Sequence, residues 1–140
     1  MILGSDHAGY EHKKQLIQHI EKMGILYSDV GTNNSSSVDY PDYAHAVSKE
    51  VLKDPSHKGI LICGSANGVA MASNKHKGVR AAICWNEEIA NLAVTHNNAN
   101  VICIPARFIS TKDQEKILDS FLKADFEGGR HKIRVDKINF

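Results

Sequence analysis

The stretch KGILICGSANGVAMASNK, residues 58–75, contains an apolar run, a turn bracketed by glycines and a second apolar segment. The run GILIC is apolar without alternation, which is typical of a strand covered on both faces. Gly64 and Gly68 bracket the turn, and the apolar residues after Gly68 have the spacing of a short helix. A strand, a turn and a helix in this order predict a βα unit, with Cys63 at the carboxyl end of its strand.

The same alternation continues along the chain. Strands are expected at residues 1–5, 25–31, 59–64, 79–84 and 100–104. Apolar stripes between them predict helices, with Gly24 ending the first, Pro41 in the first turn of the second, Asn86 capping the fourth and a Thr111–Gln114 capping box before the fifth. Five strands alternating with helices predict an α/β protein with a parallel sheet covered on both faces.

Length, charge and cysteine content exclude several classes of protein. The 140 residues suit one domain, expected to span 1–140. A formal net charge of +1 argues against a nucleic-acid or membrane partner. The apolar runs are too short for a membrane span, which needs about 20 residues, or for a signal peptide. Cys63, Cys84 and Cys103 show no disulfide or CxxC pattern, which suits free thiols in the cytoplasm.

Candidate chemical groups follow the ends of the expected strands. Open parallel sheets bind ligands at the carboxyl ends of their strands, and Asp6, Cys63 and the Gly64 turn all lie at such ends. Backbone N–H groups of the turn can hold an anion or a developing oxyanion. The start of the following helix is expected to lower the pKa of Cys63. An ordinary core cysteine beside a βα turn is an equal alternative.

Two further positions suggest acid–base chemistry. Asp6 and His7 can form an acid/base pair, although Asp6 can equally be a helix cap and His7 a solvent-facing residue. His96 follows the fourth helix, and an imidazole there can exchange protons near neutral pH or simply be half-buried beside the helix end. Tyr40 either lines a pocket or anchors the polar loop before the second helix.

The C-terminal segment is basic. A glycine hinge leads into a final helix, expected at about 128–138, that contains Arg130, His131 and Arg134 within one turn. Two guanidiniums and an imidazole suit a phosphate dianion, although such a cluster is also common on solvated faces. Arg107, after the last strand, can likewise either bind phosphate or lie on a solvated face. The eight histidines lack the paired spacing of a zinc site, so no metal is expected.

Together these segments resemble the type B ribose-5-phosphate isomerases, the family that also holds the galactose-6-phosphate isomerase subunits. The resemblance covers essentially the whole chain. It rests on the order and spacing of GSDHAGY, DVGT, DYPDYA, GILICGSANGVAMASNK, GVRAAIC, THNNANV and FEGGRHKIRV. The family implies a Rossmann-like three-layer α/β/α sandwich without a cofactor, in the cytoplasmic pentose phosphate pathway. It also implies a homodimer, with tetramers left open, whose basic tails reach the partner subunit at interfacial active sites.

The resemblance implies a role for each residue of the turn. Cys63 matches the base that moves a proton between C2 and C1 of the sugar through an enediolate. Ser65, with the backbone of Gly64, Asn67 and Gly68, matches the turn that stabilises the enediolate oxygen.

The other site residues also follow from the resemblance. His96, with Asp6 nearby, resembles the group that opens the furanose ring. The expected substrate-binding residues are Asn97 for the sugar, Tyr40 as a pocket wall, and His7, Arg130, His131, Arg134 and, with less support, Arg107 for the phosphate.

The chain departs from the family at two positions. Ala66 stands where glycine is common, and its Cβ restricts the backbone if the turn needs a positive φ. Val69 stands where some members have a glutamate base, so Cys63 is the expected base here. The first strand begins directly at Met1, which suggests that one or two native residues precede it.

Ribose 5-phosphate is the expected substrate. A six-carbon sugar phosphate, such as allose or galactose 6-phosphate, is the alternative within the enzyme class. A non-catalytic sugar-phosphate sensor and a cysteine hydrolase are alternatives from other classes.

Overall fold

The computed structural model describes residues 1–138, in which five strands form one parallel sheet of order β2-β1-β3-β5-β4. The strands are β1 (Ile2–Ser5), β2 (Ser28–Asp29), β3 (Gly59–Cys63), β4 (Ala81–Ile83) and β5 (Val101–Pro105). The helices are α1 (Tyr10–Lys22), α2 (Tyr40–Val51), α3 (Asn67–Ser73), α4 (Glu87–Thr95), α5 (Thr111–Lys123) and α6 (Arg130–Val135). The interior strands β1, β3 and β5 are buried at every position, as the nearly continuous apolar sequences of β3 and β5 require.

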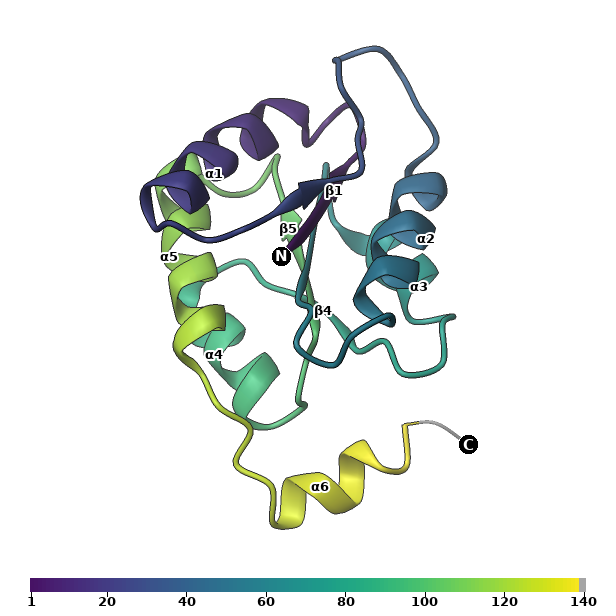
Figure 1. The fold of residues 1–140 in the computed structure, drawn as a ribbon, viewed down its shortest axis with the longest axis vertical. Coiled ribbons are helices and arrows are strands. Elements are labelled where there is room, and N and C mark those ends of the chain that lie inside the picture. Colours follow the sequence, from purple (N-terminus) through teal and green to yellow (C-terminus); the bar gives the residue numbers. More distant parts are fainter. Residues whose placement is uncertain (139–140) are drawn as a thin grey trace.

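Helices cover both faces of the sheet (Figure 1). Side chains of α1, α4 and α5 form one apolar core, and those of α2 and α3 form a second core on the other face. The predicted three-layer α/β/α sandwich is confirmed. β1 leads into α1 and β3 into α3, so the chain leaves two neighbouring strands toward opposite faces. Such a switch point opens a crevice at the carboxyl ends of these strands, where open α/β sheets bind ligands.

The edge strands are shorter than predicted. Instead of covering 25–31, the strand β2 contains only Ser28 and Asp29, which lie opposite Ile2 and Leu3 of β1. Both residues are exposed, so little packing supports a longer strand at this edge of the sheet. Leu26 is 89% exposed, which excludes it from a strand covered on both faces. At the opposite edge, β4 is also shorter than the predicted 79–84.

Several predicted helix boundaries are confirmed. Gly24 follows α1 with a φ of +68°, the left-handed conformation that commonly ends helices. Pro41 lies in the first turn of α2, where its missing N–H has no helical partner to lose. The Asn86 side chain accepts a hydrogen bond from the Ile89 amide at 2.8 Å and so caps α4.

The cap of α5 lies one residue earlier than predicted. Ser110, rather than Thr111, is the N-cap, because its Oγ accepts a hydrogen bond from the Asp113 amide at 3.1 Å. Gln114 does not complete a capping box. Its buried side chain instead donates to the His12 carbonyl oxygen of α1 at 2.9 Å, so packing between two helices determines its role.

The final helix, α6, is shorter than the predicted 128–138. Gly128 and Gly129 have φ values of +67° and +54°, so the helix begins only at Arg130. α6 lies at the end of the molecule opposite the loop that follows β2 (Figure 1). Among residues 1–138, no helix has the length and apolar character needed to cross a membrane.

Candidate active site

Asp6 and Cys63 meet in the crevice between β1 and β3. The Asp6 amide donates to the Ile62 carbonyl oxygen at 3.2 Å, which extends the contact between the two strands. The Cys63 thiol donates to Asp6 Oδ2 at 2.9 Å, and Asp6 Oδ1 accepts from the Gly9 amide at 3.0 Å. The two oxygens of one carboxylate therefore stabilise the turn before α1 and hold the thiol.

Gly9 permits this close approach. A Cβ atom at Gly9 would lie 2.2 Å from the carbonyl oxygen of Ile62, far inside van der Waals contact. Any side chain at this position would push the start of α1 away from β3. The glycine therefore allows the preceding residues, Asp6 and His7, to lie against the end of β3.

The Cys63 thiol is held in its protonated form. Burial, then the hydrogen bond and the negative charge of Asp6, raise the pKa of Cys63 to about 11. The amides of Gly64 and Ala66 act in the opposite direction, as expected for the start of a helix. The prediction of a lowered thiol pKa is therefore wrong, because burial and a carboxylate 57 residues away in sequence outweigh the turn.

The turn after Cys63 requires a left-handed residue. Ala66 has a φ of +64° and a ψ of −9° and is fully buried, so the positive φ that its Cβ disfavours is present. Ser65 and Asn67 are exposed, and the Asn67 amide lies 3.4 Å from Ser65 Oγ. The ring of Tyr40 packs directly on Gly68, where a Cβ atom would lie 2.5 Å from a ring carbon.

A pocket of about 320 Å³ opens over the thiol. Its lining consists of Asp6, His7, Ala8, Cys63, Gly64, Ser65, Arg107 and Phe108. The Arg107 side chain lies over Gly64, and His7 Nδ1 accepts a hydrogen bond from the Val38 amide at 3.3 Å. Sequence reasoning missed Phe108, which is 74% exposed at the pocket and follows Arg107 without any other signal.

A second group of predicted site residues lies at the opposite end of the strands, where the amino ends of the parallel strands meet. α4 runs back from the carboxyl edge, so His96 at its end lies near the start of β5. Its ring stacks on that of His131, with centroids 4.1 Å apart and planes 7° apart. Glu127, which sequence reasoning also missed, faces both rings. Within one chain, therefore, His96 is not beside Asp6 or Cys63.

The helix α6 has an inward and an outward face. His131 and Val135 are buried, whereas Arg130, Ile133 and Arg134 are exposed. Arg130 and Arg134 are four residues apart on this helix and therefore share its exposed face. His131 does not belong to that face, because it stacks inward on His96.

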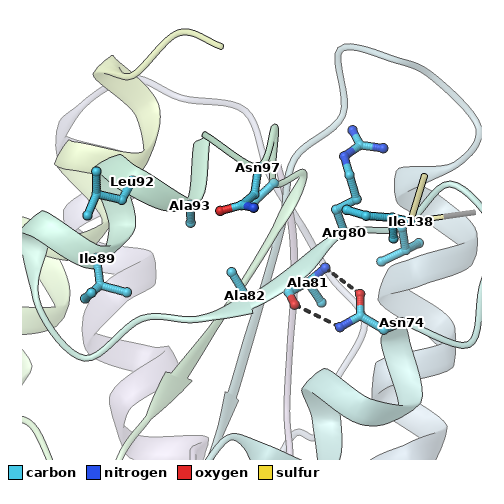
Figure 2. A pocket seen from close by; sticks show the side chains of 11 residues that line it. Asn74, Arg80, Ala81, Ala82, Ile89, Leu92, Ala93, Asn97 and Ile138 are labelled. Atoms are coloured by element: carbon cyan, nitrogen blue, oxygen red, sulfur yellow. Dashed lines mark hydrogen bonds between the residues drawn. The ribbon is translucent and has the colours of Figure 1, made fainter. Parts of the chain in front are cut away.

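Asn97 is exposed and lines a different hollow, of about 440 Å³, beside the edge strand β4 (Figure 2). In Figure 2 its side chain lies above β4, between Ala93 of α4 and Arg80. The hollow is largely apolar, with Ala81 and Ala82 of β4 on its floor. Within one chain Asn97 therefore lies outside the lining of the Cys63 pocket.

The donor atoms of His96, Glu127 and His131 lie within 4.8 Å of one another, close enough for a metal site to be considered. Zinc ligands with bonds of about 2.0–2.1 Å direct their lone pairs at one point. The stacked rings are almost parallel, so their in-plane lone pairs point side by side instead. A metal would require the rings to turn, and the absence of a metal stays a prediction.

An open parallel sheet with a thiol, a carboxylate, an imidazole and a guanidinium at its switch point defines an α/β enzyme site suited to a small anionic substrate. The chain matches the model of the ribose/galactose isomerase family over residues 1–138, and it belongs to that family. The resemblance seen in the sequence and the expected enzyme class, aldose–ketose isomerase, are confirmed.

Similar proteins cover almost the full chain. The probable ribose-5-phosphate isomerase B of Mycoplasma genitalium is 46% identical over 140 residues, covering 99% of this chain and 92% of that protein. Ribose-5-phosphate isomerase B of Escherichia coli is 38% identical over 138 residues, covering 99% and 93%.

Solved structures agree with this fold. The ribose 5-phosphate isomerase of Thermotoga maritima superimposes with a TM-score of 0.96 at 41% identity, covering 99% of this chain and 95% of that chain. The Mycoplasma genitalium ribose-5-phosphate isomerase B, with bound ribulose-5-phosphate, gives a TM-score of 0.94 at 46% identity, covering 98% and 91%.

Proposed function

We propose that this chain interconverts ribose 5-phosphate and ribulose 5-phosphate in pentose phosphate metabolism, with Cys63 as the base. The observation that carries the proposal is the Cys63–Asp6 pair at the floor of a pocket that also holds His7 and Arg107. A relative 46% identical to this chain has been solved with ribulose-5-phosphate bound. The pocket of about 320 Å³ lies within the roughly 300–1,000 Å³ typical of small-molecule sites.

The proposed reaction moves one proton between neighbouring carbons. The Cys63 proton passes to Asp6 along the existing hydrogen bond and leaves a thiolate. The thiolate takes the proton from C2 of the open-chain aldose, the C–H electrons form the C1–C2 double bond, and O1 takes the negative charge. The proton then returns from sulfur to C1, while O1 gains a proton and O2 loses one. The Gly64 and Ala66 amides beside the sulfur supply donors for the enediolate oxygen.

We propose that the working unit is a homodimer in which each site takes residues from both chains. Within one chain, His96 and the exposed arginines of α6 are remote from the Cys63 pocket. A twofold axis brings His96 and the α6 arginines of each chain to the Cys63 pocket of the other chain. The apolar hollow beside β4 offers surface for such a contact. Met71 and Trp85, which are 67% and 53% exposed elsewhere on the chain, add further apolar surface.

In this arrangement the remaining residues take complementary roles. His96 from one chain opens the furanose ring, beside Asp6 of the other. Arg130 and Arg134 join His7 and Arg107 around the phosphate. Ser65, Asn67, Tyr40 and Asn97 contact the sugar, and no cofactor takes part.

Steady-state kinetics on five- and six-carbon substrates tests this function. Ribose 5-phosphate should give a higher kcat/KM than allose 6-phosphate or galactose 6-phosphate. Cys63→Ser should lower kcat by roughly 10²–10⁴-fold with a smaller change in KM, because the base acts only in the chemical step. A near-normal kcat would remove Cys63 from this role. A higher kcat/KM on a six-carbon phosphate would reassign the substrate, and tight binding without turnover would indicate a sensor.

A further inference from the structure

We propose that Glu127 is a positioning residue that holds His96 and His131 as a stacked pair of imidazoles sharing one proton. This proposal rests on the proposed function, in which His96 acts as the acid–base group that opens the sugar ring. Glu127 is not among the predicted site residues, and no pattern of spacing connects it to His96 in the sequence.

The geometry places one carboxylate oxygen against both rings. Glu127 Oε2 lies 3.9 Å from His96 Nε2 and 3.5 Å from His131 Nε2. The Glu127 amide donates to the Thr95 carbonyl oxygen at 3.0 Å, which attaches this segment to the end of α4. This bond holds the backbone of Glu127 beside His96, and its side chain, which is 57% exposed, reaches both rings from there.

The two rings differ in their contact with solvent. The His131 side chain is 10% exposed, whereas that of His96 is 37% exposed. The buried ring of His131 therefore serves as a platform, and the ring of His96 lies on the accessible side. This arrangement suits a group that must exchange protons with a substrate.

Electrostatics favours one proton on the pair. Two imidazolium rings with centroids 4.1 Å apart repel each other, whereas two neutral rings leave the carboxylate without a cationic partner. Burial lowers the pKa of His131, and His96, Arg130 and Arg134 lower it further, while Glu127 raises it. The repulsion between the rings and the single carboxylate beside them therefore favour one proton on the pair.

An NMR pH titration of the histidine ring signals tests the pair directly, without depending on activity. Glu127→Gln should move the first protonation of the pair to lower pH by about one unit, because a nearby opposite charge is lost. Glu88→Gln, an exposed change in the first turn of α4, is the matched control and should leave it unchanged. An unchanged first protonation in Glu127→Gln would overturn the proposal.

A second variant keeps the test open if Glu127→Gln folds poorly. His131→Phe retains a stacked ring without a proton site, so His96 should titrate in a single step, and two-step titration there would contradict the pair.

The pH profile of kcat/KM supplies a kinetic readout. In Glu127→Gln, the change in kcat/KM that follows protonation of the His96–His131 pair should move to lower pH. A purely structural role would lower the rate without moving this pH dependence. A titration shift in a protein inactive on ribose 5-phosphate would support the pair and refute only the proposed function.

Discussion

The proton of the Cys63 thiol is held by a buried carboxylate. Cys63 is 7% exposed and Asp6 is 5% exposed, and both lie in the crevice at the switch point of the sheet. Because the thiolate is the reactive form of cysteine, a raised pKa keeps the resting thiol unreactive toward electrophiles. In the proposed mechanism the base is therefore formed by proton transfer to Asp6 and is not present in the resting enzyme.

Asp6→Asn should make the thiol more reactive and the enzyme less active. The carboxylate raises the pKa of Cys63 through its hydrogen bond and its charge, and the neutral amide removes that charge. Each unit by which the pKa falls gives about tenfold more thiolate at neutral pH, so alkylation by iodoacetamide should accelerate several-fold. Mass spectrometry at Cys63 measures the rate.

The surface change Asp113→Asn is the control and should leave the alkylation rate of Cys63 unaltered. In the wild type the rate should keep rising with pH toward the pKa of about 11. If Asp6→Asn alkylates no faster than wild type, burial alone would set the protonation of the thiol.

At the residue scale, the sequence predicted which side chains form the Cys63 pocket better than it predicted their surroundings and protonation. The family resemblance, in which glycine is common at the position of Ala66, pointed to a position where a positive φ would be costly, and the φ of +64° is present. The protonation of Cys63 was not predictable, because Asp6 approaches it through the tertiary fold. Glu127 lies four residues before His131, but its contact with His96 gave no signal because it depends on the tertiary fold.

Among the elements, α2 and α3 are joined outside the site by a pair of imidazoles. His45 Nδ1 on α2 and His76 Nε2, just after α3, lie 2.8 Å apart, so one ring donates and the other accepts a hydrogen bond. The first residue of α2 is Tyr40, and α3 contains Gly68, on which the Tyr40 ring packs. The histidine pair therefore helps to hold together the two helices that shape the turn.

Mild acid should weaken this connection. Burial lowers the pKa of His76, and the neighbouring His45 and Lys49 lower it further. Because its folded pKa lies below the unfolded value of about 6.5, the stability it contributes is complete above that pH and is lost as pH falls below it. The melting temperature should therefore fall by a few degrees more on acidification in the wild type than in His76→Gln.

His57→Gln, which alters a histidine outside the pair, is the control and should keep the wild-type pH dependence. Melting curves recorded across the range from neutral to mildly acidic pH measure the effect. Parallel pH dependences of the wild type and His76→Gln would exclude a contribution from the pair.

Element types followed from the sequence, whereas several boundaries depended on packing. Continuous apolar runs predicted the interior strands because both faces are buried. The edge strand β2 lacks this burial, so only its pairing with β1 defines its two residues. Ser110 and Thr111 offer the same hydroxyl chemistry as caps, and the packing of Gln114 against α1 decides between them.

In the whole molecule, the predicted site residues divide between the carboxyl ends and the amino ends of the strands. A helix that follows a strand returns toward the amino edge, so the position of His96 after α4 was itself a signal of this separation. The family resemblance brought the residues together without giving their distances. The proposed homodimer reconciles the two observations, because in that arrangement each chain supplies one half of each site.

Restoration of activity between two inactive variants tests this account most directly. Cys63→Ala and His96→Ala chains are co-expressed, and the conversion of ribose 5-phosphate to ribulose 5-phosphate is compared with wild type and with each variant alone. Random pairing makes half of the dimers mixed, and one of the two sites in each mixed dimer is intact, so the account predicts about a quarter of the wild-type activity. Activity no higher than that of the single variants, in a mixture that contains mixed dimers, would contradict a site shared between chains.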